Sequence, residues 1–358
     1  MTRTLLRPTG FVDSPFGHHG KVARLAGGMN WFSSVELIRV EGHGRTGTEL
    51  VAVENIESRF DEDMAAQWRA LTAPRPPLQL GERTVRLDQP QVMAIINATP
   101  DSFSDGGQFA DAAAAAEAGA RMAAEGAAII DVGGESTRPG ARSIWEGDEI
   151  ARIEPVIRQL ASGGAAVSVD SRKSDVMTTA VAAGARMIND VSALTYDQRS
   201  AEVAASLNMP VVLMHHQGDP QTMQDDPRYD DVLVEVYLWL EERIAAVIDA
   251  GIARQNILID PGFGFGKNVA HNLELMNGLA LFHSLGQPLV LGASRKRTIG
   301  ALSGEAPVDK RLGGGIAFAM KAVEQGAQVI RAHDAFETVQ ALRVWRGMRD
   351  QALTPRLQ

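Results

Sequence analysis

Basic side chains that could hold an anion gather in three short segments of the sequence. Arg138 follows two hydroxyl residues in the glycine-rich stretch 131–140, Lys296 lies between two arginines, and Arg331 lies two residues before His333. A guanidinium forms paired, charge-assisted hydrogen bonds with phosphate oxygens, and a glycine-rich turn exposes backbone N–H groups to the same oxygens. We therefore expect these side chains to converge on an anion such as a diphosphate.

Polar side chains that suit a heterocycle end other apolar segments. Asp170, Asn189 and Asp260 each close a short apolar run. Carboxylates and carboxamides can pair with a ring that bears amino and lactam groups. An aspartate at the end of a strand is also the usual N-cap of the next helix, and Asp190 fits that structural role as well as a binding role. Asp260 has no obvious basic neighbour in the sequence, which favours ligand binding.

The polar segment 97–107 has the composition of a lid over a substrate. Asn97 offers an amide to a cation or a phosphate, and Asp101 and Asp105 add carboxylates. An Asp- and Ser-rich turn would explain the polarity, but it would not explain the aromatic ring of Phe103. We expect this segment to close over a bound substrate.

Two other patterns are weaker. Residues 262–267 (GFGFGK) lack the spacing and the Lys-Ser/Thr ending of a phosphate-binding P-loop. His215 and His216 could ligate a metal with Asp260 or Glu135, but adjacent residues of a strand point to opposite faces, so at most one of them faces a site. A metal hydrolase is therefore disfavoured.

The elements that position these residues repeat along the chain. Short apolar runs alternate with longer Ala-rich segments of helical spacing, among them residues 111–125 and 231–250. The runs are residues 92–97, 127–131, 166–170, 186–190, 211–215, 257–260, 289–294 and 328–333. Continuous apolar strands suit a parallel sheet buried on both faces, and an eightfold strand–helix repeat predicts an α/β fold of the (β/α)8 TIM-barrel type over residues 78–358. The polar residues lie at the carboxyl ends of the strands, which is the catalytic face of such barrels.

Residues 1–77 lie outside the repeat and predict a small α+β extension. Residues 35–40 and 50–57 indicate two strands, residues 61–71 a helix, and residues 73–77 (APRPP) a stiff linker. We expect a docked, non-catalytic module without which the barrel still folds. The sequence does not indicate its function.

Composition restricts the class of protein. The 358 residues include no Cys, which excludes disulfides, thiolate metal sites and a Cys nucleophile and fits a reducing cytoplasm. No segment resembles a signal peptide or a membrane span, so we expect no membrane partner. A formal net charge of −9 disfavours nucleic-acid binding, and an anionic substrate needs the local basic cluster described above.

Eight segments together resemble the strand-end motifs of the dihydropteroate synthases. In chain order they are ATPDSFSDGG, DVGGESTRPGA, VDSRK, INDV, LMHHQG, DPGFGFGK, GASRK and RAHD. The resemblance runs from about Leu78 to Arg349. It implies a cytoplasmic homodimer that uses Mg²⁺ and joins p-aminobenzoate to (7,8-dihydropterin-6-yl)methyl diphosphate, releasing diphosphate.

The resemblance also implies a role for each matching residue. The pterin residues would be Asp170, Asn189, Met214, Asp260 and Lys296. The diphosphate residues would be Asn97, Thr137, Arg138, Arg331 and His333, with Asn97 as the Mg²⁺ ligand. The p-aminobenzoate pocket would contain Phe103, Pro139, Phe265 and Ser294. The catalytic residues would be Asp101, Asp105, Lys296 and Arg331, with the two aspartates facing a pterin-methyl cation.

Some residues depart from the family's usual pattern. Arg297 replaces a usual Ser, His216 a usual Met, and Ala98 a usual Val. Arg297 puts the shape of the p-aminobenzoate mouth, and so sulfonamide sensitivity, in question. Two alternatives remain: a pterin-binding barrel that transfers methyl groups from methyltetrahydrofolate, which needs no STRPG or SRK segment, and an inactive pterin-binding protein, which would be expected to have lost anion-binding residues.

Overall fold

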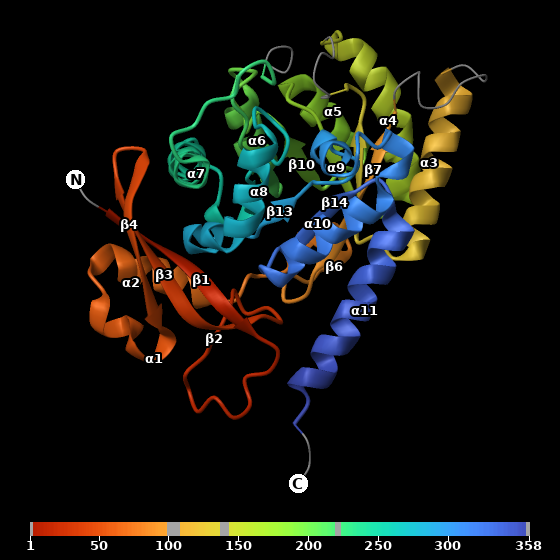
Figure 1. Cartoon of the computed structure of the whole chain (residues 1–358). Coiled ribbons are helices and arrows are strands. Elements are labelled where there is room, and N and C mark those ends of the chain that lie inside the picture. The colour runs from red at the N-terminus through yellow and green to blue at the C-terminus, as the bar shows by residue number, and fades with distance from the viewer. Residues whose placement is uncertain (1–2, 99–107, 137–142, 219–222, 356–358) are drawn as a thin grey trace.

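The computed structural model describes residues 3–98, 108–136, 143–218 and 223–355. Its main body is a barrel of eight parallel strands in the order β12-β11-β10-β9-β8-β7-β14-β13, surrounded by helices (Figure 1). The strands are β7 (Gln91–Asn97), β8 (Ile129–Gly133), β9 (Val167–Asp170), β10 (Met187–Asp190), β11 (Val211–Met214), β12 (Ile257–Asp260), β13 (Val290–Leu291) and β14 (Val329–Ala332). An isolated bridge between Ile259 and Leu289 connects the two ends of this order. The predicted (β/α)8 barrel is confirmed.

Each predicted apolar run overlaps one barrel strand, although β7 begins one residue before its run and β8 ends two residues after its run. Residues 289–294 contain only the short strand β13, because the chain pairs with β14 at Val290 and Leu291 and then leaves the sheet. β12 and β13 meet only through the isolated bridge, so the join between them, which we call the seam, has the fewest backbone hydrogen bonds of the barrel described here.

Helices follow the strands, as the helical spacing predicts. They are α3 (Gln108–Glu125), α4 (Glu146–Ser162), α5 (Ser174–Ala183), α6 (Ser200–Leu207), α7 (Val232–Asp249), α8 (Val269–Gly278), α9 (Arg297–Leu302), α10 (Leu312–Glu324) and α11 (Ala335–Leu353), with the 3-10 helices η3 (Arg254–Asn256), η4 (Leu279–Leu285) and η5 (Val308–Lys310). Asp231 caps α7, where its carboxylate accepts from the Val234 N–H at 3.1 Å. No helix in the described part of the chain combines the length and the apolar character needed to cross a membrane.

A hairpin closes the amino-terminal end of the barrel. Its antiparallel strands are β5 (Leu78–Leu80) and β6 (Arg83–Val85). Their buried side chains pack in one cluster with the first inward-facing residues of the barrel strands, among them Met93, Met187 and Val329. This apolar layer separates the closed end from the polar end.

The amino-terminal extension is an antiparallel sheet with helices on one face. Its elements are β1 (Arg3–Val12), β2 (Ala23–Arg24), β3 (Trp31–Glu41), β4 (Gly44–Ala52), α1 (Val53–Ile56), η1 (Glu57–Arg59) and α2 (Glu62–Thr72). The predicted strand 50–57 is wrong after Ala52, because Val53 and Ile56, three residues apart, are buried together on one side of the short helix α1. The predicted helix 61–71 is confirmed, with Asp61 as its N-cap. The sequence did not predict β1.

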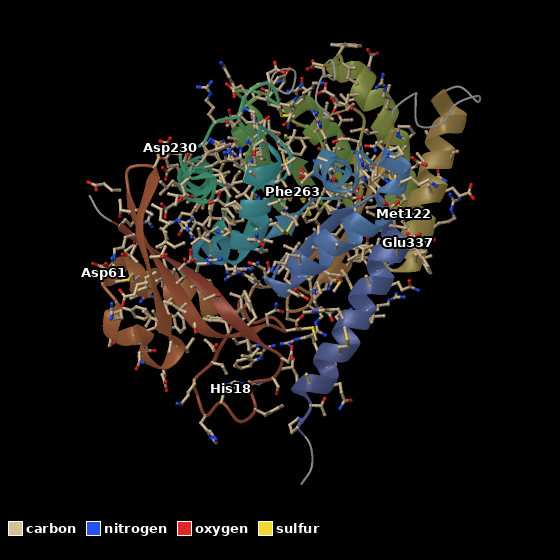
Figure 2. All side chains as sticks on the ribbon, viewed as in Figure 1. His18, Asp61, Met122, Asp230, Phe263 and Glu337 are labelled. Carbon is tan, nitrogen blue, oxygen red and sulfur yellow. The ribbon has the colours of Figure 1, made fainter. Side chains whose placement is uncertain are left out.

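The two faces of this sheet pack on different partners. Leu6 and Leu37 belong to the extension's own core with α2, whereas Leu5, Ile38 and Val40 belong to the large core of the barrel. β1 and α2 pack on η4, which connects the two seam strands. Figure 2 shows His18 and Asp61 on the outer side of the extension and Phe263 among the side chains of the barrel. The extension therefore packs on the flank of the barrel beside the seam.

Candidate functional site

Strand alternation places the predicted site residues inside the barrel. Side chains two residues apart on a strand share a face. The inward residues Ile129, Met187, Val212, Leu258 and Val329 form the apolar layer above the hairpin. Two residues further along the same strands, the inward positions are Asp131, Asn189, Met214, Asp260 and Arg331. Polar and charged side chains therefore form the floor of the open end.

Arg331 connects the acidic residues of this floor. Its Nε donates to Oδ2 of Asp131 at 2.7 Å, and its Nη2 donates to Oδ2 of Asp170 at 2.6 Å. Asn189 donates from Nδ2 to the same Asp131 oxygen at 2.9 Å. Burial alone would lower the pKa of Arg331, but the charges of Asp131 and Asp170 outweigh it and raise that pKa. The guanidinium is therefore a permanent cation between strands β8, β9 and β14.

The carboxyl group of Asp170 has a raised pKa. Burial raises its pKa to about 7, with Arg331 opposing the rise and Asp131 adding to it. Its side chain lies against the backbone of Gly133, where an added Cβ would come within 3.3 Å of the Asp170 Cβ. These contacts fix the carboxyl group at the boundary between β8 and β9.

Asp260 ends the seam strand β12, and Lys296 is the N-cap residue of α9, in the segment that follows the seam strand β13. The Gly262 N–H donates to Oδ1 of Asp260 at 2.7 Å. Nζ of Lys296 lies 3.7 Å from the centre of the Phe265 ring, and no described carboxylate lies within ion-pair distance of it. Burial and the nearby Arg331 lower the pKa of Lys296 to about 7, although Asp260 and Asp170 oppose this. Met214, the ladder partner of Asp260, is 7% exposed beside them.

The ends of β13 and β14 bring Ser294 and His333 together. The His333 N–H donates to Oγ of Ser294 at 3.2 Å, and the ring Nδ1 lies 3.2 Å from the same oxygen. Asn97 ends β7 opposite Gly133 in the ladder register. Arg295 is exposed and forms an ion pair with Asp334.

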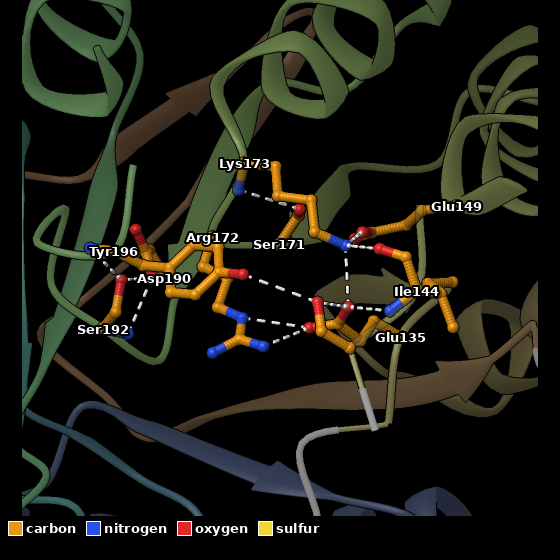
Figure 3. Close-up of polar contacts among 10 residues, drawn as sticks. Glu135, Ile144, Glu149, Ser171, Arg172, Lys173, Asp190, Ser192 and Tyr196 are labelled. Atoms are coloured by element: carbon orange, nitrogen blue, oxygen red, sulfur yellow. Dashed lines mark hydrogen bonds and ion pairs between the residues drawn. The ribbon is translucent and has the colours of Figure 1, made fainter. Parts of the chain in front are cut away.

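A buried ionic network at the ends of β8 and β9 is centred on Glu135 (Figure 3). Its carboxylate accepts from Arg172 Nε at 2.9 Å, Lys173 Nζ at 2.7 Å and the Ile144 N–H at 2.9 Å. Lys173 also donates to Glu149 of α4 at 2.7 Å. Burial alone would raise the pKa of Glu135, but Lys173 and the Ile144 N–H lower it below its usual value. The network joins the β8 end to the β9 end and to the start of α4.

Asp190 has a structural role. Its carboxylate accepts from the N–H and the hydroxyl of Ser192, both at 2.7 Å, and from the Leu194 N–H at 3.0 Å. These bonds hold a turn in which Leu194 has a φ of +62°. Asp190 therefore stabilises a local turn and is not the N-cap of the next helix, α6, whose N-cap residue is Arg199.

The structure brings together the described members of the predicted site. These are Asn97, Asp170, Asn189, Met214, Asp260, Phe265, Ser294, Lys296, Arg331 and His333, all at or just beyond the carboxyl ends of strands. Asp101, Phe103, Asp105, Thr137, Arg138 and Pro139 lie outside the described residues. The sequence reasoning missed Asp131, and the available signal was a carboxylate in the apolar run AAIIDV. It also missed Glu135, Arg172 and Lys173 as a network.

The comparisons with known proteins agree on one family. A sequence model described as pterin binding enzyme matches residues 93–333. The dihydropteroate synthase of Escherichia coli K12 is 47% identical over 259 residues, which cover 72% of this chain and 91% of that protein. The enzyme of Neisseria meningitidis serogroup B is 46% identical over 275 residues, 75% of this chain and 96% of that protein. This chain belongs to the dihydropteroate synthase family.

Solved structures of the family superpose on the barrel. A Xanthomonas albilineans dihydropteroate synthase with 4-aminobenzoic acid has a TM-score of 0.73 and 46% identity, covering 78% of this chain and all of that chain. A second structure of that enzyme, in complex with 7,8-dihydropteroate, has a TM-score of 0.70 and 43% identity. The chain is therefore a transferase of folate biosynthesis that joins p-aminobenzoate to the dihydropterin diphosphate. The family match begins at Met93, so the extension lies outside it.

Proposed function

We propose that the polar floor of the barrel binds the dihydropterin ring through the oxygens of Asp131, Asn189 and Asp260. The observation that carries the proposal is the set of free acceptors there. Oδ1 of Asp131 is buried and has no hydrogen-bond partner among the described residues, and Asp260 uses Oδ1 to accept from the Gly262 N–H. An aminopyrimidinone ring presents adjacent N–H donors that match carboxylate oxygens. A ring bound here satisfies an acceptor that is otherwise costly to bury.

Three further side chains would complete the pterin pocket. Lys296 donates to the ring carbonyl, Asp170 accepts from a ring N–H, and Met214 covers one face of the ring. The position of Lys296 against the Phe265 ring, with no described carboxylate as partner, supports this role. An ammonium that has no internal acceptor is available to a ligand oxygen.

The outer part of the site would hold the other two groups. We assign Asn97, Thr137, Arg138, Arg331 and His333 to the diphosphate. Arg331 uses Nε and Nη2 for Asp131 and Asp170, which leaves Nη1 outside these ion pairs. The p-aminobenzoate ring is assigned to Phe103, Pro139, Phe265 and Ser294.

The reaction needs charge stabilisation more than a strong base. The pterin CH₂–O bond breaks with its electron pair leaving on the diphosphate, and the resulting cation is conjugated with the ring. The aniline nitrogen of p-aminobenzoate then forms the C–N bond and loses a proton to water. Arg331 stabilises the leaving anion, and Asp101 and Asp105 are proposed to face the cation.

The described side chains could hold Mg²⁺ only together with oxygen atoms of the substrate. Mg²⁺ prefers oxygen ligands and is commonly held by one or two protein groups plus substrate phosphates. Asn97 supplies an amide oxygen, and the described residues contain no group of three or more His, Asp or Glu side chains that could hold a metal ion. We propose that Asn97 and the diphosphate oxygens hold the ion, which would neutralise charge on the leaving group.

We also propose a homodimer through α10 and α11. Leu312, Phe336, Val344 and Met348 are large apolar side chains that are 38%, 52%, 59% and 61% exposed on these helices. On α11 they recur at helical spacing along one face. An exposed apolar face of this kind is typical of a subunit interface.

The absence of Cys from the sequence supports a cytoplasmic location, because a chain without disulfides suits a reducing compartment.

Product formation tests the function. The full-length chain is incubated with the dihydropterin diphosphate, p-aminobenzoate and Mg²⁺, and dihydropteroate and diphosphate are quantified. We expect equal amounts of the two products and no dihydropteroate when p-aminobenzoate is omitted. A folded chain that forms neither product would contradict the proposal.

A further inference from the structure

Lys267 is a buried lysine that forms no ion pair with a carboxylate in the described part of the chain. It ends the segment Asp260–Lys267 between β12 and α8, and it is 2% exposed. Its Nζ lies 2.8 Å from Nδ1 of His215, 3.1 Å from the Gly262 carbonyl and 3.0 Å from the Phe265 carbonyl. An ammonium has three donors, and three acceptors are present. Each of the three ammonium donors thus has an acceptor, and burial lowers the pKa of Lys267 to about 7 although Asp260 opposes this.

Each acceptor belongs to a residue that also touches the site. The Gly262 N–H donates to Asp260, and the Phe265 ring lies against Lys296. The N–H of His215 donates to the Asp260 carbonyl at 2.9 Å. One ammonium therefore holds the residues that orient Asp260 and Lys296.

The segment fits tightly over this ammonium. Gly262 has a φ of +70°, and a Cβ there would lie 1.7 Å from the His215 carbonyl oxygen. A Cβ on Gly266 would lie 2.4 Å from the Gln217 carbonyl oxygen. Both glycines allow the backbone to approach the end of β11, where His215 begins the next segment. The GFGFGK pattern is explained by this packing.

The remaining carbonyls of the segment have their own donors. Gln224 donates to the Gly264 carbonyl at 2.7 Å, and the Tyr229 hydroxyl donates to the Gly266 carbonyl at 2.9 Å. Lys267 donates to the carbonyls of Gly262 and Phe265, the two residues that contact Asp260 and Lys296, and the Phe265 N–H also donates to the Gly262 carbonyl at 3.1 Å. Loss of its ammonium would remove the side-chain donor to these two carbonyls and leave the donors to the carbonyls of Gly264 and Gly266 in place.

We propose that Lys267 is a positioning residue of the pterin pocket, which orients Asp260 and Lys296 through the carbonyls of Gly262 and Phe265. The inference rests on the proposed binding of the pterin ring by Asp260 and Lys296. Lys267 does not touch the substrate. Its role is to hold the acceptor and the donor of the ring in one relative geometry.

The test compares ring binding with anion binding in Lys267→Met. Binding of 6-hydroxymethylpterin, which has no diphosphate, and of Mg²⁺-diphosphate is measured by calorimetry on the full chain. We expect the variant to lose at least about tenfold in pterin affinity and to keep diphosphate affinity within about twofold. The KM of the pterin substrate should rise more than kcat falls. Lys310→Met, an exposed lysine of η5, is the matched control and should change neither affinity.

The outcomes separate this inference from the proposed function. An unmodified chain that does not bind 6-hydroxymethylpterin contradicts the proposed function. A chain that binds it, with equal affinity in Lys267→Met, overturns the role of Lys267. If Lys267→Met fails to fold, His215→Gln, which keeps an acceptor, should retain pterin affinity and His215→Leu should lose it. Equal affinity of these two would also overturn the inference.

Discussion

At the scale of residues, the alternation of side chains between the two faces of a strand explains most of the site. Asp260 and Asn189 were predictable because each ends an apolar run, and a strand end inside a barrel faces the ligand. The role of Asp131 could not be predicted from the sequence. Its partner Arg331 lies 200 residues away in the chain, and only the fold places the two side chains together. Charge pairing across the barrel is set by the fold and has no local signal.

Asp260→Asn should reduce the affinity for 6-hydroxymethylpterin by at least about tenfold, which is about 1.4 kcal/mol. An amide cannot accept from the Gly262 N–H and from ring donors as a carboxylate does, because one of its two polar atoms is a donor. Calorimetry measures the effect. Asp249→Asn, an exposed aspartate at the end of α7, is the control, and equal affinities of both variants would remove Asp260 from the pterin pocket.

Asp170 should make stability depend on pH in a defined range. Burial raises its pKa from 3.8 to about 7, so between these values the folded chain holds a proton that the unfolded chain has released. The free energy of unfolding should therefore fall, relative to Asp170→Asn, as the pH rises from about 4 to about 7, and the difference should be constant above pH 7. Urea unfolding of both proteins at several pH values measures it. A difference that does not change across this range would contradict the raised pKa.

At the scale of elements, the Glu135 network explains how the ends of β8 and β9 stay in register beyond their last ladder pair. Gly133 pairs with Asp170, and two to three residues further on Glu135 accepts from Arg172 and Lys173 (Figure 3). The repeat predicts both strands, but it does not predict this connection, which uses side chains of two loops and of α4. The network supports the position of Asp170.

Glu135→Gln should destabilise the fold by about 3 kcal/mol, because breaking a buried ion pair leaves Lys173 with one carboxylate fewer. Pterin affinity should also fall, since Asp170 lies on the adjoining strand end. The control is Glu154→Gln on helix α4, whose ion pair with Arg158 is exposed and should be worth less than about 0.5 kcal/mol. If urea unfolding gives the same free energy for both variants, the network has no supporting role.

At the scale of the whole molecule, the extension packs on the barrel through apolar and polar contacts. Arg75, predicted in a linker, is 6% exposed and donates to the His283 carbonyl of η4 at 2.9 Å. Asn30 donates to the Val323 carbonyl of α10 at 2.9 Å, and Arg3 forms an ion pair with Glu241 of α7 at 2.5 Å. The sequence predicted the extension as a unit but not these contacts, because their partners lie more than 200 residues away. We propose that residues 1–77 stabilise the seam and take no part in catalysis.

A chain that starts at Leu78 should be much less stable than the full chain. The sequence predicts a docked module without which the barrel still folds, and the loss of stability should be large because η4 is fully buried in the large core that Leu5 and Ile38 join. Exposing two large side chains such as Leu281 and Phe282 costs about 3 to 6 kcal/mol, which is a large part of a typical domain's stability. Thermal unfolding measures the loss. An unchanged melting temperature and unchanged specific activity would show that the extension is dispensable.

The most direct test of the account is a crystal structure of the chain with 7,8-dihydropteroate. We predict the pterin ring inside the barrel, with ring N–H groups at about 3 Å from the oxygens of Asp260 and Asp131 and the ring carbonyl beside Lys296. The p-aminobenzoate ring should lie toward Phe265 and Ser294. A ligand bound outside the carboxyl ends of the strands, or a pterin ring without contacts to Asp260 and Lys296, would contradict the account.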